Sequence, residues 1–562
     1  MRLPLGSSAL WAPALTLVLT LLPTGSLLAR DNWPTPPMKA REPVPEVSGP
    51  LTGGTTDHTK LEALNKRFAS GPEVTRACLS CHTETGKHFM KNVHWTWDYK
   101  DPKTGQQLGK RHLVNNFCTN ARGNEGMCAQ CHAGYGWKDE SFDFSNQNNI
   151  DCLICHDSTG TYYKTPNSGG NKACSVMFEG MKPIDLTLVA RAVGLPKRAN
   201  CGACHFNGGG GDNVKHGDLS SALNDPPRSL DVHMSPQGVN FACTNCHVTK
   251  DHIFAGSRYA MVAKDRNGQG KPGERRDVAT CESCHGTAPH PDGSVKHRKL
   301  NHHVASVACQ TCHIPAFARG GVATIMDWDW RTAGRLKNGE GYHEEGYVQG
   351  NGQERHTYKS IKGSFSYAEN VAPYYAWFDG QMRYTTVDTH FDMNRQPIPI
   401  NAFEGSRLDG RSRIWPFKRM HTWQPFDTGN GTLVYTHLWG DDTDAYWGNY
   451  DMGKAIARGM KDFGLEYSGQ YGFLETVSYW PITHMVAPKE DALACRECHA
   501  KGGRMAEIKG VYLPGRDNSP WVDMAGIVLV LGTAVGALGH GLMRRIVRRG
   551  AATTNDTEGS QR

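Results

Sequence analysis

One pentapeptide pattern, Cys-x-x-Cys-His, occurs eight times in this chain of 562 residues. A chain with this content of cysteine and histidine would hold about 0.03 copies by chance. Two cysteines three residues apart can each form a thioether bond to a haem vinyl group, and the following histidine can ligate the iron from one face. We therefore interpret the eight copies as attachment sites for eight covalently bound haem c groups.

The predicted attachment residues are two cysteines and one iron-ligating histidine per motif. In chain order they are Cys78, Cys81 and His82; Cys128, Cys131 and His132; Cys152, Cys155 and His156; Cys201, Cys204 and His205; Cys243, Cys246 and His247; Cys281, Cys284 and His285; Cys309, Cys312 and His313; and Cys495, Cys498 and His499. Zinc sites are the competing interpretation, but they need paired sets of ligands at matching separations, which these separate pentapeptides do not form.

Eight haems also account for an unusual composition. Only 38% of the residues are hydrophobic, and 63 glycines and 30 prolines weaken a core built from side chains alone. Haem is a large, mostly apolar body that can fill such an interior. The formal charge of +7 is offset by about sixteen haem propionates, so the basic residues give no reason to expect a nucleic-acid partner.

Both ends of the chain predict export and membrane attachment. Residues 1–29 have a basic start, an apolar run and small residues before Ala29, which is typical of a secretory signal peptide; a retained anchor is the alternative. Residues 30–57 form a Pro-rich linker. Residues 524–543 are apolar and long enough to cross a bilayer, and the arginine-rich tail 544–562 that follows predicts a cytoplasmic C-terminus. We expect the bulk of the chain on the periplasmic side of the inner membrane.

The motif spacing divides the remainder into two regions. Seven motifs crowd into residues 58–313, whereas residues 314–510 are rich in aromatic residues and hold only the eighth motif near their end. We expect the second region to wrap the haem cluster, with a helix over residues 453–463. The predicted fold is mainly α with extensive irregular loops and few strands, organised around the haems, plus one C-terminal transmembrane helix.

Histidines outside the motifs are the candidates for the second axial ligand of each haem. Eighteen of the 26 histidines remain after the motifs are subtracted, so most haems are expected to be ligated by two histidines. Such haems store and transfer electrons but leave no iron open to a substrate. Catalysis therefore requires at least one haem with a vacant or displaceable distal ligand.

Several segments make the chain resemble a known family of multihaem proteins. They are Gly71-Pro72-Glu73-Val74, His94-Trp95-Thr96-Trp97, Asn115-Asn116-Phe117-Cys118, Gly134-Tyr135-Gly136-Trp137-Lys138-Asp139, Asp151-Cys152-Leu153-Ile154-Cys155-His156-Asp157, and the glycines 208–211 followed by Asp212-Asn213-Val214-Lys215-His216-Gly217-Asp218. Over residues 58–505 the chain resembles the octahaem c-type cytochromes of the tetrathionate reductase family, relatives of hydroxylamine oxidoreductase. The two ends lie outside the resemblance.

The resemblance implies that the second haem, with His132 as its proximal ligand, is catalytic and that a lysine occupies its distal side. It also implies a cysteine and an acidic residue nearby. Lys215, with Asp212 three residues before it, fits that pattern best, and Lys164 is the reserve candidate. Asp212 is expected to position the substrate or relay protons. A lysine ligates only as a neutral amine, so its pKa must be depressed. His216, next to Lys215, is expected to ligate a different haem.

Cys118 and Cys174 are the two cysteines outside the motifs. A disulfide between them is one interpretation for an oxidising compartment. The resemblance favours Cys118 as a thiol beside the catalytic haem, where a sulfur-containing substrate would bind. Cys174 stays unassigned.

We predict an oxidoreductase that reduces tetrathionate, with nitrite and hydroxylamine as further candidates for a small sulfur or nitrogen substrate. A hydroxylamine or hydrazine oxidase is one alternative, for which Tyr467, Tyr471 and Tyr479 are available as cross-linking residues, and a pure electron conduit is another. The expected electron donor is quinol-linked or another cytochrome at the membrane. The sequence leaves open whether the chain forms a homo-oligomer.

Overall fold

The computed structural model describes residues 56–115, 117–164, 169, 184–268, 278–291 and 293–558. The predicted signal peptide, most of the Pro-rich linker and Cys174 lie outside the described residues. Residues Gly49–Arg562 form one structural unit, so both predicted regions, 58–313 and 314–510, belong to the same folded body.

Short helices carry the motifs of the first region. The helices up to the seventh motif are α2 (Gly71–Leu79), α3 (Thr85–Phe89), α4 (Val93–Thr96), α5 (Glu125–Cys128), α6 (Leu153–His156), α7 (Leu186–Arg191), α8 (Arg198–His205), α9 (Cys243–Cys246), α10 (Glu282–His285), α11 (Val295–His303) and α12 (Cys309–His313). Two small hairpins lie among them, β1–β2 (Tyr99–Lys100 with Gln107–Leu108) and β3–β4 (Thr249–Lys250 with Ile253–Phe254). The connecting chain is irregular, as predicted.

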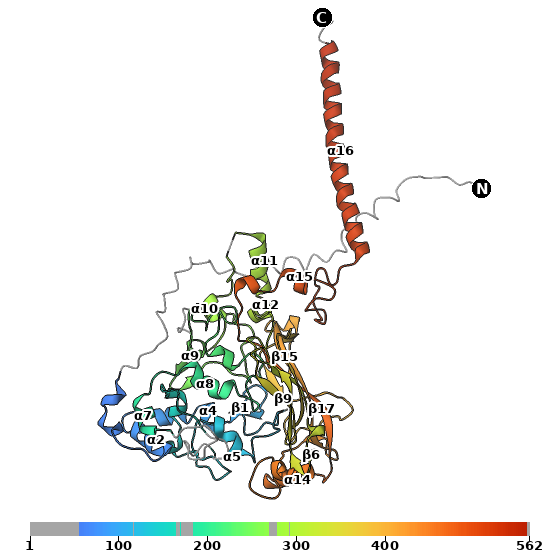
Figure 1. Cartoon of the computed structure of the whole chain (residues 1–562). Coiled ribbons are helices and arrows are strands. Elements are labelled where there is room, and N and C mark those ends of the chain that lie inside the picture. Colours follow the sequence, from blue (N-terminus) through green and yellow to red (C-terminus); the bar gives the residue numbers. More distant parts are fainter. Residues whose placement is uncertain are drawn as a thin grey trace, which may run out of the picture. The chain divides into compact units, whose positions relative to one another are not determined.

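The expectation of few strands is wrong for the second region, because a nine-stranded sheet fills much of it (Figure 1). Its members are β5 (Thr324–Asp329), β8 (His343–Val348), β9 (Glu354–Lys359), β10 (Gly363–Ala368), β11 (Tyr374–Phe378), β13 (Ile398–Pro399), β15 (Arg413–Asp427), β16 (Thr432–Leu433) and β17 (Tyr471–Pro481). The order is β13-β17-β15-β5-β10-β9-β8, with β11 and β16 also paired to β15. Pairing is antiparallel except for β13 with β17 and β15 with β5. Two further hairpins, β6–β7 (Leu336–Lys337 with Glu340–Gly341) and β12–β14 (Met382–Tyr384 with Asn401–Phe403), complete the region.

Aromatic residues explain the error. Aromatic and β-branched side chains favour a pleated, half-buried surface, and β15 and β17 are rich in them. The sequence alone predicts only that this region packs around the haem cluster. The sheet instead uses Trp328, Met420 and Trp480 in a core shared with Phe117 and Val214 of the first region.

The predicted helix at residues 453–463 is confirmed as α14 (Met452–Asp462), which follows α13 (Tyr446–Asn449). Asp451 caps it by accepting a hydrogen bond from the backbone N–H of Lys454 at 3.1 Å. Residues at helical spacing on one face are buried in the core, among them Ile456 and Met460.

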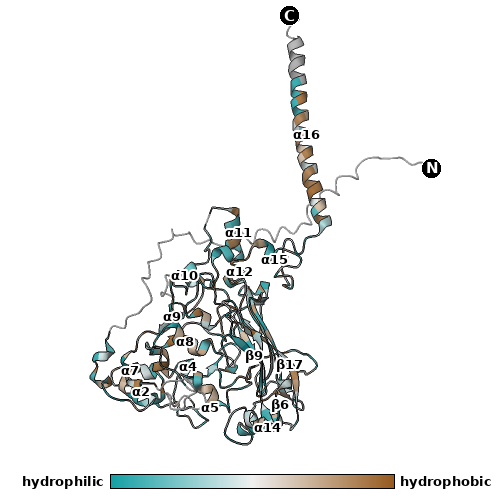
Figure 2. Ribbon diagram, in the orientation of Figure 1, coloured by the Kyte–Doolittle hydropathy of each residue, from teal (hydrophilic) through white to brown (hydrophobic). Residues whose placement is uncertain are grey.

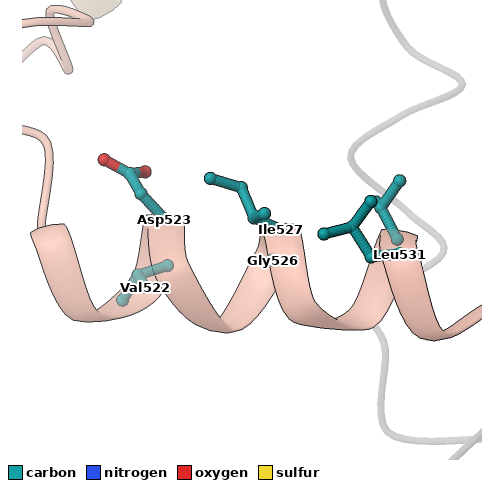
Figure 3. Close-up of a pocket in the computed structure, with 6 residues that line it drawn as sticks. Val522, Asp523, Gly526, Ile527 and Leu531 are labelled. Carbon is teal, nitrogen blue, oxygen red and sulfur yellow. The ribbon is translucent and has the colours of Figure 1, made fainter.

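The chain continues from α15 (Cys495–Cys498) into α16 (Pro520–Glu558). Within α16, Pro520–Arg549 is long and apolar enough to cross a membrane by length and composition, and its apolar 18-residue window has a mean hydropathy of 1.9. Figure 2 shows the apolar residues along this helix, and their side chains are exposed. The shallow hollow in Figure 3 is lined by α16 alone, including Val522, Asp523 and Ile527, so it is not a candidate reaction site.

Packing of α14 gives a stability prediction. Replacing the fully buried Ile456 by alanine should lower the free energy of unfolding by about 2–5 kcal/mol, because it leaves a cavity. Replacing the exposed Lys454 by alanine should change it by less than about 0.5 kcal/mol. Guanidinium unfolding of the haem-loaded protein measures both; equal effects of the two changes would contradict the packing.

Candidate functional site

Most motifs form a helical turn that presents the histidine. The backbone N–H of His82, His156, His247, His285 and His499 donates to the carbonyl of the first cysteine of its motif, at 2.8–3.1 Å. The turn at the second motif is tighter. The backbone N–H of His132 donates to the carbonyl of Ala129, three residues before it, at 2.9 Å. This hydrogen bond continues a short 3-10 turn, Ala129–Cys131, and the backbone at His132 is extended.

Seven motif histidines each face a second histidine from outside the motifs. The pairs, with the distance between ring centroids, are His82 with His58 (6.4 Å), His156 with His252 (6.5 Å), His205 with His94 (6.0 Å), His247 with His484 (6.4 Å), His285 with His233 (6.0 Å), His313 with His290 (6.4 Å) and His499 with His303 (6.1 Å). With metal–nitrogen bonds of about 2 Å, two imidazoles on opposite sides of one metal have centroids about 6 Å apart. The seven pairs therefore have the spacing that bis-histidine haem requires.

Hydrogen bonds orient several of these rings. The Nδ1 atom lies 2.8–3.1 Å from a carbonyl or carboxylate oxygen, which leaves Nε2 available for a metal. The contacts are His156 with Gly194, His247 with Ala255, His499 with Pro514, His94 with Asn92, His290 with Asn301 and His484 with Asp218. The donor set and its orientation fit haem iron.

His132 has a different environment. Among the ring contacts of the described residues, it is the one motif histidine that does not face another histidine. Its ring lies against Trp95, Trp97 and Trp137, with centroids 4.8–5.5 Å apart. Its Nε2 lies 2.6 Å from the Trp95 carbonyl oxygen, and its buried Nδ1 has no hydrogen-bond partner. The ring must therefore turn for Nε2 to reach an iron held at Cys128 and Cys131.

Lys215 lies close to the second motif, as Lys110 and Lys164 also do. Its Nζ lies over the rings of Trp480 (4.7 Å) and Phe117 (6.0 Å), and it interacts electrostatically with Cys131. Burial holds the pKa of Lys215 well below its ordinary value, and repulsion from Arg258 and Lys110 adds to the effect. A neutral amine, the form that can ligate a metal, is thereby favoured.

The backbone that carries Lys215 is tied to the sheet. The buried Lys418 of β15 donates to the carbonyls of Val214 (2.8 Å) and Lys215 (3.0 Å), and Thr324 of β5 donates to that of Asn213 (2.6 Å). The preceding loop has Gly209 and Gly210 at φ of +83° and +93°, in the left-handed region that favours glycine. The strands that the sequence analysis missed therefore position the candidate distal ligand.

Cys118 is half-buried and packs against the core cluster that contains Phe117 and Trp480. It interacts electrostatically with Cys128 of the second motif and with Lys359 of β9. Cys118 and Lys215 therefore both lie close to the second motif. Asn116 and the proposed disulfide partner Cys174 lie outside the described residues.

Three other predicted residues have different surroundings. The carboxylate of Asp212 accepts hydrogen bonds from the backbone N–H of Ser221, at 2.9 Å, and from its hydroxyl, so it turns to that loop. The buried Lys164 donates to the carbonyls of His132 and Gly134 and lies 3.6 Å from Asp151. His216 packs on Trp480 at 5.6 Å and is absent from the seven pairs formed by the described histidines.

Basic residues that the sequence analysis missed surround the same site. Lys110 lies over the Trp97 ring at 4.3 Å, Arg258 lies 5.7 Å from the Trp480 ring, and Lys362 lies over Trp328 and Trp447. They come from distant parts of the chain, so no local pattern marks them as a group. Together with Lys359 they make the site cationic, which suits an anionic ligand.

Cysteine contacts show which motifs are neighbours. The first and third motifs meet through Cys78 and Cys152, the fourth and fifth through Cys201 and Cys243, the sixth and seventh through Cys281 and Cys309, and the second and fourth through Cys131 and Cys204. Electrostatic interactions link Cys155 with Cys201, Cys246 with Cys284, and Cys312 with Cys498. The motifs thus form a line in the order first, third, fourth, fifth, sixth, seventh and eighth, with the second beside the fourth.

Comparisons with known proteins relate the chain to cytochromes c. A family model described as Cytochrome c bacterial matches residues 325–502, and one described as Cytochrome c554 and c-prime matches residues 242–314. The crystal structure of octaheme cytochrome c from Shewanella oneidensis is similar, with a TM-score of 0.70 and 39% sequence identity, over 83% of this chain and 98% of that one. No curated protein matches the chain. These similarities support covalently bound haem c at the motifs.

Glu125, at the start of α5, supplies a testable pH dependence. Burial raises the pKa of Glu125 to about 7 from an ordinary value of 4.5. Because the folded pKa is the higher one, this carboxyl group stabilises the fold fully below pH 4.5 and loses that contribution as the pH rises through about 7. The free energy of unfolding should fall by up to about 3 kcal/mol over this interval.

Glu125→Gln should remove that decline, whereas Glu140→Gln, at a neighbouring exposed acid, should keep it. Denaturant unfolding at a series of pH values measures the difference. Parallel pH profiles for the wild type and Glu125→Gln would show that Glu125 titrates normally.

Proposed function

Because the chain belongs to the octahaem cytochrome c family, we propose that it carries eight haem c groups and is a multi-electron reductase of tetrathionate at the second motif. The observation that carries the proposal is the absence of a histidine opposite His132 among the described residues, where seven other motif histidines have one. Bound haem c supplies one-electron storage and transfer, together with an iron whose distal ligand can be exchanged.

The seven histidine pairs suit electron delivery, because each would saturate its iron. Cys131 contacts Cys204 of the fourth motif, which is inside the line of motifs rather than at its end. Electrons from either direction can therefore converge on the second motif. This arrangement favours a reaction that needs more than one electron without release of an intermediate.

Lys215 is the proposed distal ligand at the second motif. Its neutral amine would bind weakly enough to be displaced, and Lys418 and the sheet hold its backbone in place. Lys164 is already committed to the His132 and Gly134 carbonyls, which makes it the poorer candidate. We assign Asp212 to holding the Ser221 loop rather than to proton transfer.

The charge of the site supports an anionic substrate. Lys110, Arg258, Lys359 and Lys362 would attract tetrathionate or nitrite more strongly than uncharged hydroxylamine. Cleavage of the central S–S bond of tetrathionate takes two electrons and no proton, and gives two thiosulfates. Cys118 provides a soft thiol beside this position and no proton donor is needed, which makes tetrathionate the first candidate.

The two alternative functions fit the contacts less well. Tyr467 packs on the core cluster around Trp480, Tyr471 is exposed, and Tyr479 packs on Phe403 and Tyr374. None of these contacts is with a residue of the second motif, so they single out none of the three tyrosines as the haem cross-link that such an oxidase carries. A pure conduit would be expected to have a histidine opposite His132 as well.

Localisation follows from the same proposal. The haem c sites and the apolar helix α16 support an extracytoplasmic protein anchored to the inner membrane, with a quinol-linked donor. The predicted signal peptide is consistent with it.

The direct test is anaerobic reoxidation of the viologen-reduced protein by tetrathionate, nitrite and hydroxylamine in separate assays. We expect catalytic turnover, fastest with tetrathionate and more strongly inhibited by salt with the anions than with hydroxylamine. No turnover with any of the three would contradict a reductase.

Lys215→Ala should convert one haem of the eight from low spin to high spin and leave the other seven unchanged, because only the second iron loses a ligand. Electron paramagnetic resonance of the oxidised protein measures the change. Lys164→Gln, which keeps a donor to the His132 and Gly134 carbonyls, is the matched control and should retain the wild-type spectrum. The reverse result would identify Lys164 as the ligand.

A further inference from the structure

The line of motifs has two ends, and they differ in their relation to α16. The first motif, with the pair His58–His82, forms one end, and the eighth motif, with the pair His303–His499, forms the other. Both ends reach the surface, since Cys81 and Cys495 are exposed. Exposure alone therefore does not identify the end at which electrons enter.

The eighth motif is tied to the chain just before α16. The Nδ1 of His499 lies 3.0 Å from the carbonyl oxygen of Pro514, and α16 begins at Pro520. Six residue steps span at most about 20 Å, even when fully extended. Whatever the orientation of α16, the proximal ligand of the eighth haem is held within that reach of the start of the apolar helix.

Several contacts fix the segment that connects the eighth motif to α16. Gly515, at φ +86°, approaches the His499 carbonyl so closely that a Cβ would lie 2.3 Å from that oxygen. The Arg516 guanidinium donates to the carbonyls of Met505, Ile508 and Val511 and pairs with Asp517. The side chains of Met505, Ile508 and Leu513 are buried against Tyr375 and Ile414. The described residues of the first end have no comparable tie to α16.

Exposed basic residues outnumber exposed acidic residues at this end of the line. His303 is the last residue of α11, whose Lys296, Arg298 and Lys299 are exposed. Arg496 and Lys501 are exposed on the neighbouring eighth motif and the turn after it. A partner that docks here would need an acidic face.

We propose that the eighth haem is the electron entry port, at which a membrane-bound quinol-oxidising protein with an acidic docking face delivers electrons beside α16. This inference rests on the proposed membrane attachment and on haem at the eighth motif, but not on the identity of the substrate. Electrons would then pass along the line of histidine pairs to the fourth motif and its neighbour, the second.

The test uses membranes that contain the full haem-loaded chain and measures haem reduction by a soluble quinol, with no substrate present. His303→Met is compared with His58→Met at the opposite end, because methionine ligation raises the reduction potential of the haem it serves. In redox titrations each variant should show one haem at a higher potential, which verifies the two ligand assignments.

In the His303→Met variant, quinol should reduce one haem at the wild-type rate. The other seven haems should be reduced at least tenfold more slowly, because electron transfer from the eighth haem to the next one becomes uphill. In the His58→Met variant, quinol should reduce all haems at the wild-type rate except the haem of the first motif. Slow reduction in His58→Met alone, equal slowing in both variants, or no slowing in either would overturn the proposal.

A charge variant tests docking without touching a ligand. Reversal of Lys296, Arg298 and Lys299 to glutamate should lower the rate of quinol-driven reduction at least fivefold at low salt. Reversal of the exposed Lys60, Lys66 and Arg76 near the first motif is the matched control and should change the rate less than twofold. Equal effects of the two reversals would contradict docking at α11. Reduction by dithionite should be unchanged in both charge-reversal variants. Because no substrate is present, these outcomes can be interpreted even if the reductase assay shows no turnover.

Discussion

The distance between paired imidazole rings is the constraint on which the rest of this structure depends. Seven pairs of histidines keep ring centroids 6.0–6.5 Å apart, although the two members of a pair lie up to 237 positions apart, as for His247 and His484. A metal between two rings imposes this spacing. The short helices, the irregular loops and the modest apolar content all follow from a fold arranged around these pairs.

His132 is the motif histidine that has no such partner among the described residues, and we propose the second motif as the reactive position. Its ring lies among three tryptophans, and the buried Lys215 lies close to the same motif. Burial and neighbouring cations favour the neutral amine there, whereas the same cations favour an anion as the incoming ligand. A single electrostatic arrangement thus accounts for both the displaceable ligand and the anionic substrate that we propose.

Sequence alone predicted the motifs, the helix now seen as α14 and the apolar helix at the C-terminal end. It could not assign distal histidines, because the partner of His247, for example, is set by tertiary folding and not by local spacing. It also missed the sheet, since aromatic residues pack equally well on a pleated surface and around a cofactor. That error concealed how Lys418 and Thr324 hold the Lys215 segment.

The central claim is that seven irons have two histidine ligands and the second iron has a lysine. The most direct measurement is a crystal structure of the haem-loaded protein at a resolution that identifies the distal ligand of each iron. The account predicts Nζ of Lys215 at the iron attached through Cys128 and Cys131, and the seven histidine pairs at the others. A histidine at the second iron, or Lys215 directed away from it, would contradict the account.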